Sequence, residues 1–368
     1  MTVAVEDLAG DLAAWLGERM GADDVTVSGF VRPAAGQSSD NVLFEALANG
    51  RVEHLVLRRQ TVGTTIFRDP DVCREAQVLQ GLSTAGIRVP KVRWIEPNSA
   101  VLGAPFFVMD RVQGRVPLGK PSIHTAGWLP TLTPAERERL WSSALEVLVS
   151  VHAIPWRSSH DFLLDGDPIA ATVGAHVTAL GDWYRWSTAE RVYPVTDAAL
   201  EYLEEHLTVI DAGDPVLLWG DPRVGNMLFA DDHTVAAAVD WETASIGPAG
   251  RDVAHWLFFD EFQTEAVGIE RLSGWPDRDT TVACYEMSSG RHLGDLLYFD
   301  VMESLFMATT LIRQADRREA MGLAPRGNRM GHDNTVTQML ARKLGLTVPP
   351  LSPDYIAHRG GLPEMDRT

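Results

Sequence analysis

Two regions of the chain differ in the spacing of their apolar residues. In the first region, apolar positions recur at helical spacing over 5–20, and Asp69-Pro70 predicts the start of a main helix that runs to about Ala85. Asn49-Gly50 predicts a tight hairpin turn between two strands. Alternating or continuous apolar runs predict strands over 25–32, 41–48, 52–59, 92–95 and 105–112.

After Gly114 the spacing becomes mainly helical. The run Thr133-Pro134-Ala135-Glu136 has the pattern of a capping box, which predicts a helix that ends before Pro155. From Pro349 onward the chain is expected to be irregular. Short apolar runs predict strands over 216–218, 227–229 and 235–239, and helical spacing predicts helices over 168–187, 196–209, 250–262, 279–290, 294–320 and 333–345.

These patterns predict an α+β fold with two lobes. Residues 1–112 are expected to form an N-terminal lobe with an antiparallel sheet and one main helix, and residues 113–368 a larger helical C-terminal lobe. A hinge at about 109–116 is expected to connect them. At 368 residues the chain is long enough to bury a core in each lobe.

The composition argues against a membrane-spanning protein and against a nucleic-acid-binding protein. No apolar run reaches the length of a membrane span, and the N-terminus has no basic signal-like region, so we expect a cytoplasmic protein without a membrane partner. The net charge of −18 argues against a nucleic-acid partner. The oligomeric state is not readable from the sequence.

The segment from Trp219 to Asn226, followed by Asp240, carries the strongest chemical signal. A turn at 231–233 between two short strands is expected to bring Asn226 and Asp240 side by side. Phosphoryl transfer uses a base that orients the attacking hydroxyl, and an Asn and an Asp that hold Mg²⁺ against the triphosphate. The spacing therefore predicts Asp221 as the catalytic base and Asn226 and Asp240 as ligands of Mg²⁺.

A nucleotide also needs groups that hold its phosphates. Arg58 shares a face of the third strand with Val56, and Glu75 on the following helix is placed to pair with it. Without Glu75, Arg58 would be interpreted as an exposed arginine at the end of a strand. Small residues between the first two strands could cover phosphates with backbone N–H groups and hydroxyls: Gly36, Gln37, Ser38 and Ser39.

Taken together, these residues resemble the aminoglycoside phosphotransferase/choline kinase family, which has the protein-kinase-like fold. Within it, the chain is similar to the kinase-like region of acyl-CoA dehydrogenase family member 10. The resemblance covers roughly residues 25 to 260 and is carried by Gly36-Gln37-Ser38, Val56-Leu57-Arg58-Arg59, Arg74-Glu75, Phe106-Phe107-Val108-Met109, Trp219-Gly-Asp-Pro-Arg-Val-Gly-Asn226, Asp240-Trp-Glu242 and Gly247-Pro248.

The resemblance implies a phosphotransferase that uses ATP or GTP with Mg²⁺ and phosphorylates a hydroxyl group of a small molecule. It implies that Met109, Asp110 and Val112 of the hinge line the adenine site. It also implies that Asp252 braces the C-terminal lobe.

Two positions depart from the family pattern. The family's His is Trp219 here, and the usual strand Lys is Arg58, which keeps the charge but differs in reach and geometry. These departures leave open a second hypothesis, a catalytically weak nucleotide-binding kinase-like module. The histidines, including His152, His255 and His292, are expected to be packing or surface residues.

The acceptor is left open between two classes. Carboxylates at Glu201, Glu204, Glu205, Asp260, Glu261 and Glu265 would suit an amino sugar or another cation if they faced the cleft, although such charges usually lie on solvated helix faces. The resemblance to the acyl-CoA dehydrogenase subgroup instead indicates a hydroxylated acyl compound. Trp183, Trp186, Phe258 and Phe259 would then provide an apolar wall.

Overall fold

The computed structural model describes residues 5–32, 40–63, 65–210 and 212–359. The chain divides into two compact units, Met1–Gln113 and Gly114–Thr368, which are described separately below. Gly36, Gln37, Ser38 and Ser39, which are predicted to cover the phosphates, lie outside the described residues.

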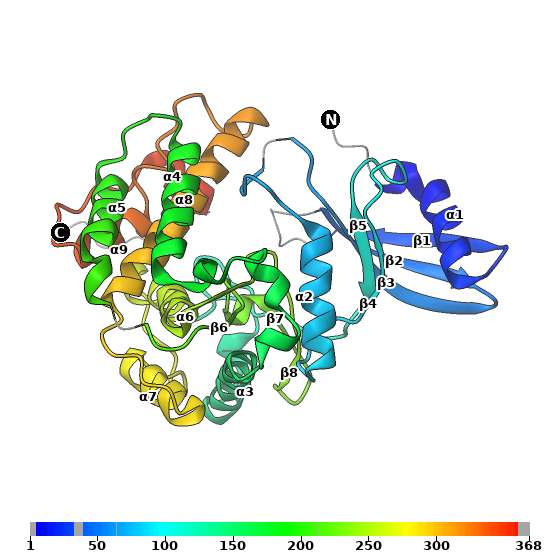
Figure 1. The fold of residues 1–368 in the computed structure, drawn as a ribbon, viewed down its shortest axis with the longest axis horizontal. Helices are drawn as coiled ribbons and strands as arrows, with labels where there is room; N and C mark the ends of the chain where they lie inside the picture. The colour runs from blue at the N-terminus through cyan, green and yellow to red at the C-terminus, as the bar shows by residue number, and fades with distance from the viewer. Residues whose placement is uncertain (1–4, 33–39, 64, 211, 360–368) are drawn as a thin grey trace. The chain divides into compact units, whose positions relative to one another are not determined.

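The N-terminal unit contains a five-stranded antiparallel sheet in the order β1-β2-β3-β5-β4 (Figure 1). Asn49 and Gly50 both have positive φ, 52° and 73°, and form the two-residue turn between β2 and β3 as predicted. The strands are β1 (Val25–Val31), β2 (Asp40–Ala48), β3 (Arg51–Arg59), β4 (Val92–Glu96) and β5 (Phe106–Asp110).

Two helices accompany this sheet. The apolar face of α1 (Ala9–Met20) packs against it through Trp15, whose ring meets Phe106 edge to face at 4.8 Å. The second helix, α2 (Val72–Thr84), contacts β4 and β5. It begins later than Asp69-Pro70 predicts, because the side chain of Asp71 accepts the backbone N–H of Arg74 and acts as the N-cap.

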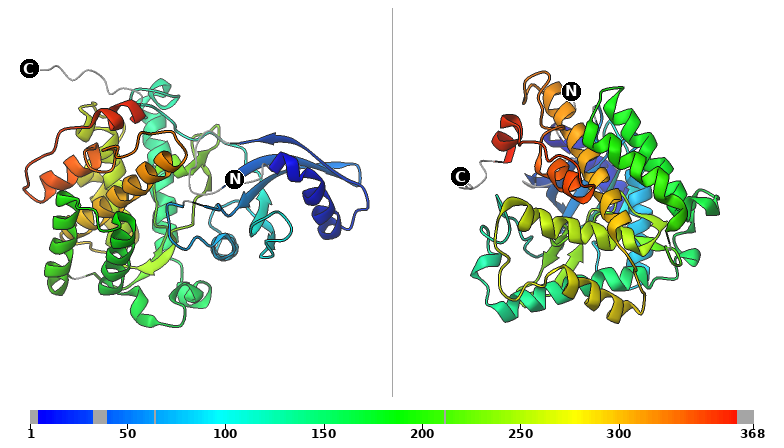
Figure 2. Two further views of the ribbon diagram at one scale, coloured as in Figure 1. Left: turned by 90° about the horizontal axis from the view of Figure 1, so that it is seen from above. Right: turned by 90° about the vertical axis from the view of Figure 1, so that its left-hand side faces the viewer.

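The C-terminal unit is mainly helical. Figure 2 shows its longest helix, α8 (Leu297–Ala320), running among the others, and α8 contacts α4, α5, α6 and α9. The predicted capping box is confirmed, because Thr133 and Glu136 exchange hydrogen bonds at the start of α3. The helices are α3 (Pro134–His152), α4 (Val173–Thr188), α5 (Pro194–His206), α6 (Ala249–Gln263), α7 (Arg278–Ser289), α8, α9 (Thr335–Lys343) and α10 (Pro353–Arg359).

Helix α10 corrects the expectation of an irregular chain after Pro349. Its Tyr355 is buried in an apolar cluster with Phe258, Met330 and Met339, and this burial fixes the segment against the unit. Within the described ranges, no helix is both long and apolar enough to cross a bilayer.

Two small antiparallel ladders carry the segments that matter for chemistry. β7 (Met227–Phe229) pairs with β8 (Val235–Ala238), as the turn at 231–233 predicts. β6 (Val216–Leu218) pairs with β9 (Ser245–Gly247), a strand that the sequence did not predict because Ser-Ile-Gly contains no apolar run. The segment 216–247 therefore forms two ladders: β7 pairs with β8, and β9 then pairs with β6, where the segment begins.

Candidate active site

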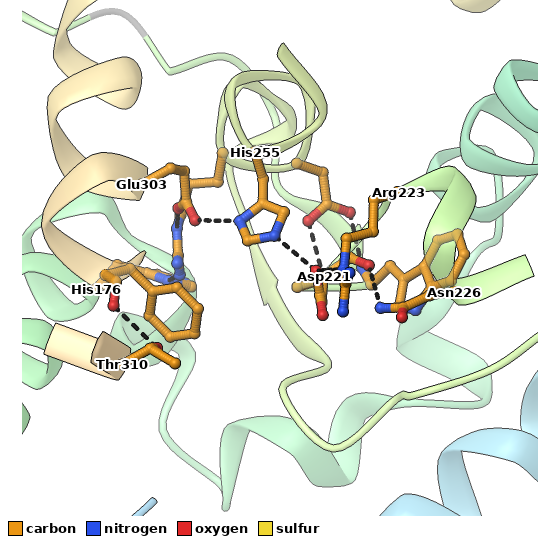
Figure 3. Close-up of polar contacts among 12 residues, drawn as sticks. His176, Asp221, Arg223, Asn226, His255, Glu303 and Thr310 are labelled. Carbon is orange, nitrogen blue, oxygen red and sulfur yellow. Dashed lines mark hydrogen bonds and ion pairs between the residues drawn. The ribbon is translucent and has the colours of Figure 1, made fainter. Parts of the chain in front are cut away.

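Asp221 follows β6 in a loop, and its carboxylate is 21% exposed. Both hydrogen bonds to this carboxylate end on one oxygen: Oδ1 accepts Arg223 Nε at 2.9 Å and His255 Nε2 at 2.8 Å (Figure 3). Among the described residues, no group donates to Oδ2. One oxygen of Asp221 is thus held by the protein, and the other is available to a ligand.

The surroundings of Asp221 keep it ionised. Burial by itself would raise the pKa of the carboxyl group, but the charge of Arg223 and the hydrogen bond from His255 outweigh it and hold the pKa well below its ordinary value. A carboxylate with so low a pKa is a weak base. It is suited to orient a hydroxyl group and to accept its proton late in a reaction.

Asn226 lies directly beside this loop. Its side-chain Nδ2 donates to the backbone carbonyl of Asp221 at 3.0 Å, and its own backbone carbonyl accepts the N–H of Val239 at 2.9 Å. No donor among the described residues reaches the amide oxygen of Asn226. This oxygen is therefore available to coordinate a cation.

Asp240 lies just after the end of the β7–β8 ladder, next to Val239. Its backbone is left-handed, with a φ of 68°. Burial would lower the pKa of Arg223, but the charges of Asp221 and then Asp240 outweigh it and raise the pKa above its ordinary value. Both carboxylates therefore act on the guanidinium of Arg223. The structure thus brings the segments of Asp221, Asn226 and Asp240 together within the C-terminal unit.

The donor set suits a hard divalent cation. An amide oxygen and a carboxylate are oxygen ligands of the kind that Mg²⁺ takes, and Mg²⁺ commonly completes its shell with water and substrate phosphates. No cluster of three or more His, Cys, Asp or Glu side chains in the described ranges is arranged to hold a metal. Asn226 and Asp240 carry the oxygen types that an ion shared with a bound polyphosphate would take.

Trp219 occupies the position at which the family pattern has His. The side chain is fully buried and stacks on Trp241, with ring centroids 4.7 Å apart. Its Nε1 donates to the backbone carbonyls of Val239 and Asp240 at 3.2 and 3.1 Å. The indole therefore ties the start of the Asp221 loop to the segment that carries Asp240.

Asp252 on α6, which the resemblance implies braces the C-terminal lobe, binds the backbone just before Asp221. Its carboxylate is buried and accepts the backbone N–H groups of Trp219 and Gly220 at 2.7 and 2.9 Å. It also accepts His152 Nε2 at 3.0 Å, and the other ring nitrogen of His152 lies 2.6 Å from the hydroxyl of Tyr285. Three donors thus hold one carboxylate and fix the backbone that leads to Asp221.

Gly220 permits the sharp turn before Asp221. Its φ is +88°, and a Cβ atom there would lie 2.5 Å from both the carbonyl oxygen and Oγ1 of Thr243. We expect Gly220→Ala to lower the free energy of unfolding by about 1–3 kcal/mol, because it adds a clash to the backbone strain. Urea denaturation measures this loss.

Gly290→Ala is the matched control for that variant. Gly290 also has positive φ, +68°, but a Cβ atom there would meet no other atom within 4 Å, so only the backbone strain applies. Equal losses in the two variants would contradict the close packing of Gly220 against Thr243.

In the N-terminal unit, Arg58 and Glu75 form a buried ion pair. Arg58 Nε donates to Glu75 Oε2 at 2.5 Å, and both residues are at most 5% exposed. Cross-strand pairing of Val56 with Met109 places Met109 on the face of the sheet that carries Arg58. Asp110 belongs to the opposite face and pairs with Arg93 at 2.8 Å, and Val112 follows the end of β5.

Sequence reasoning missed Arg223, and it assigned no role to His255 in the site. Both side chains bind Asp221. His255 lies one helical turn after Asp252, so both belong to the same side of α6, and this spacing was the signal available. His292, in contrast, is a surface residue as expected, with 86% of its side chain exposed.

A cavity of about 190 Å³ adjoins the Asp221 loop within the C-terminal unit. Its walls include Arg223, Trp256, Phe259 and Trp275, and the guanidinium of Arg223 lies 4.6 Å from the ring centre of Phe259. Asp260 also lines it, but this carboxylate already accepts hydrogen bonds from Arg271 and Trp275. Phe258, expected to line the acceptor site, is instead buried in the apolar core.

The chain is similar in sequence to parts of known proteins. The chain is 30% identical over 207 residues to human acyl-CoA dehydrogenase family member 11, which covers 55% of this chain and 25% of that protein. It is 28% identical over 204 residues to mouse acyl-CoA dehydrogenase family member 10, which covers 55% of this chain and 18% of that protein. The chain therefore matches only a quarter or less of the length of these relatives.

Two solved structures show the fold. One is a candidate aminoglycoside phosphotransferase from Ralstonia eutropha, with a TM-score of 0.68, 22% identity, and coverage of 91% of this chain and 98% of that one. The other is aminoglycoside phosphotransferase APH(4)-Ia in a ternary complex with ADP and hygromycin B, with a TM-score of 0.56, 17% identity, and coverage of 92% and 100%. The expected α+β, protein-kinase-like fold is confirmed. A model of the phosphotransferase enzyme family matches residues 29–281, and the chain belongs to this family.

Proposed function

We propose that this protein transfers the γ-phosphoryl group of ATP or GTP to a hydroxyl group of a small molecule. The observation that carries the proposal is the ionised carboxylate of Asp221, whose Oδ2 is left available while Asn226 holds the backbone of the same loop. In the reaction, the acceptor oxygen forms a bond to the γ-phosphorus, and the bond to the β,γ-bridging oxygen breaks. The nucleoside diphosphate leaves with that electron pair, and the hydroxyl proton passes to Asp221.

Asn226 and Asp240 would hold Mg²⁺, which neutralises the charge of the triphosphate when it is bound.

In the N-terminal unit, Arg58 would bind phosphate oxygens while Glu75 fixes its guanidinium. Gly36, Gln37, Ser38 and Ser39 would cover the phosphates. Met109 and Val112 would line the adenine site, and Asp110, whose side chain belongs to the opposite face, would contribute only its backbone. The ADP complex of the similar phosphotransferase supports a nucleotide co-substrate.

The cavity beside Arg223 favours an apolar or anionic acceptor over a polycation. It offers aromatic walls and one guanidinium. Asp260, the carboxylate in its wall, is occupied by Arg271 and Trp275. Glu201, Glu204 and Glu205 are exposed on α5 and provide no acidic wall for the cavity. The names of the acyl-CoA dehydrogenase relatives agree with a hydroxylated acyl acceptor.

A coupled ADP- or GDP-release assay tests the proposal. Purified protein with Mg²⁺ and ATP or GTP is screened against hydroxy acids, hydroxyacyl thioesters, sugars, choline and aminoglycosides. We expect acceptor-dependent release with at least one hydroxylated acid or acyl compound, and mass spectrometry should show an added phosphoryl group. No phosphorylated product from any acceptor would contradict the proposal.

A catalytically weak nucleotide-binding module is the second candidate, and the ion pair of Arg223 with Asp221 favours it. This pair lowers the basicity of the carboxylate that is placed to accept the proton. A rise in melting temperature with Mg-ATP, together with no transfer to any acceptor, would support this candidate over the first.

Replacing Glu75 by Gln tests the nucleotide half of the proposal. Gln keeps the shape but loses the charge that holds Arg58, so we expect KM for ATP to rise about 10-fold, the effect of losing one charged hydrogen bond. Steady-state kinetics at saturating acceptor measure it. Glu18→Gln on the exposed side of α1 is the control, and an unchanged KM in Glu75→Gln would contradict the role of Arg58.

A further inference from the structure

A chain of charged side chains leads from Asp221 into the core of the C-terminal unit. Figure 3 shows His255 between two carboxylates: Nε2 donates to Asp221 Oδ1 at 2.8 Å, and Nδ1 donates to Glu303 Oε2 at 3.0 Å. The second oxygen of Glu303 accepts Arg251 Nε at 2.7 Å. The side chains of His255 and Glu303 are each only 1% exposed.

The chain ends at a neutral group. Arg251 Nη1 donates to His176 Nδ1 at 2.6 Å, and His176 Nε2 donates to the carbonyl of Ile246 at 2.8 Å. His176 therefore carries one proton, and burial followed by the charge of Arg251 lowers its pKa to about 4. The charged members of the chain are thus Asp221, His255, Glu303 and Arg251.

The geometry requires His255 to carry two protons. An ionised carboxylate can only accept hydrogen bonds, and each ring nitrogen of His255 faces one. Burial would lower the pKa of His255, but the hydrogen bonds to Asp221 and Glu303 outweigh it and raise the pKa to about 9. The ring is therefore an imidazolium at neutral pH, flanked by two negative groups.

We propose that His255, fixed in place by Glu303, is a positioning residue for Asp221 that holds Oδ1 and thereby presents Oδ2 to the acceptor hydroxyl. The inference rests on the proposed phosphotransferase function and adds to it the atom that receives the proton. His255 itself touches neither nucleotide nor acceptor in this role. It acts through the orientation of the carboxylate.

Arg223 binds the same oxygen but is less suited to this task. Its side chain is 33% exposed and lines the cavity, whereas that of His255 is 1% exposed. An anionic acceptor that enters the cavity would compete for the guanidinium. The contact from His255 comes from a packed helix and is retained when Arg223 turns to a ligand.

Stability alone explains this buried chain poorly. Burying charged groups costs desolvation energy, and replacing a buried ion pair by apolar residues is often neutral or stabilising. Glu303 and His255 lie on α8 and α6, two helices that already contact each other. A line of charges that ends on Asp221, the partly exposed carboxylate of the site, is better explained by orientation of that side chain.

Two substitutions of His255 distinguish positioning from packing. His255→Phe keeps an aromatic ring but removes both donors, whereas His255→Gln retains an N–H donor. We expect kcat to fall about 100-fold in His255→Phe, the cost of a misplaced catalytic group, and to recover about 10-fold in His255→Gln, with KM for ATP changed by less than about 3-fold. The same exchanges at His332, which stacks on Tyr193 at 3.9 Å, are the matched controls and should leave kcat unchanged.

A second measurement does not depend on turnover. In protein labelled with [15N]histidine, the ring nitrogens of His255 should both be protonated at pH 7.5, and Glu303→Gln should convert the ring to a neutral form. If the wild type phosphorylates no acceptor, the proposed function fails while this measurement still tests the arrangement of His255. A neutral ring in the wild type, or wild-type kcat in His255→Phe, overturns the inference.

Discussion

Replacing Asp221 by Asn should lower kcat by about 10²- to 10⁴-fold, the usual contribution of a group that handles the proton in the transition state. Asn keeps the shape of the side chain but cannot accept the hydroxyl proton. Nucleotide binding should change little, because Arg58, the proposed phosphate ligand, and Asn226 and Asp240, the proposed ligands of Mg²⁺, remain. Single-turnover kinetics with Mg-ATP, together with titration calorimetry for the nucleotide, separate the two effects.

Asp231→Asn serves as the control for this experiment. Asp231 lies in the exposed turn between β7 and β8, a few residues from the site, and should retain wild-type kcat. A value of kcat for Asp221→Asn within 3-fold of the wild type would remove Asp221 from the proposed chemistry.

The second large effect is expected at Asp252. Asp252→Asn replaces one carboxylate oxygen by an NH₂ group, which then faces a donor: the N–H of Trp219, the N–H of Gly220 or the ring of His152. A buried donor loses its partner and the buried site loses its negative charge. We expect the free energy of unfolding to fall by about 3 kcal/mol.

Chemical denaturation at pH 7 measures this loss, and kcat should fall with it because the loop before Asp221 loses its brace. Asp182→Asn is the control, since Asp182 makes only an exposed ion pair with Arg185 and its loss should cost less than about 1 kcal/mol. Equal stability of the Asp252 and Asp182 variants would show that the three hydrogen bonds are dispensable.

The regular elements were largely predictable because their signals are local. The Asn49-Gly50 turn and the Thr133–Glu136 capping box each depend on residues within one turn, and both form as predicted. Helix α2 begins at Val72 because Asp71 competes with Asp69 as N-cap, a choice that the pattern alone does not decide. Strand β9 and helix α10 are stabilised by partners distant in the sequence, so their short segments carry no comparable signal.

The candidate site was predictable only in part. Asp221, Asn226 and Asp240 could be predicted because Asn226 follows Asp221 by five residues, and a strand, a turn and a strand then lead to Asp240. The contributions of His255 and Glu303 depend on the packing of α6 against α8, which the helical spacing of Asp252 and His255 does not reveal. Arg223 was missed because an arginine two residues after a carboxylate is common and acquires meaning only from its bond to Oδ1.

The stacked pair Trp219 and Trp241 has a consequence for how this protein can vary. Because the indole of Trp219 both fills space against Trp241 and donates to the carbonyl of Asp240, a smaller imidazole at 219 would leave a void unless its neighbour grew or shifted. Substitutions at positions 219 and 241 should therefore occur together. Close relatives that carry His at the first should differ at the second as well.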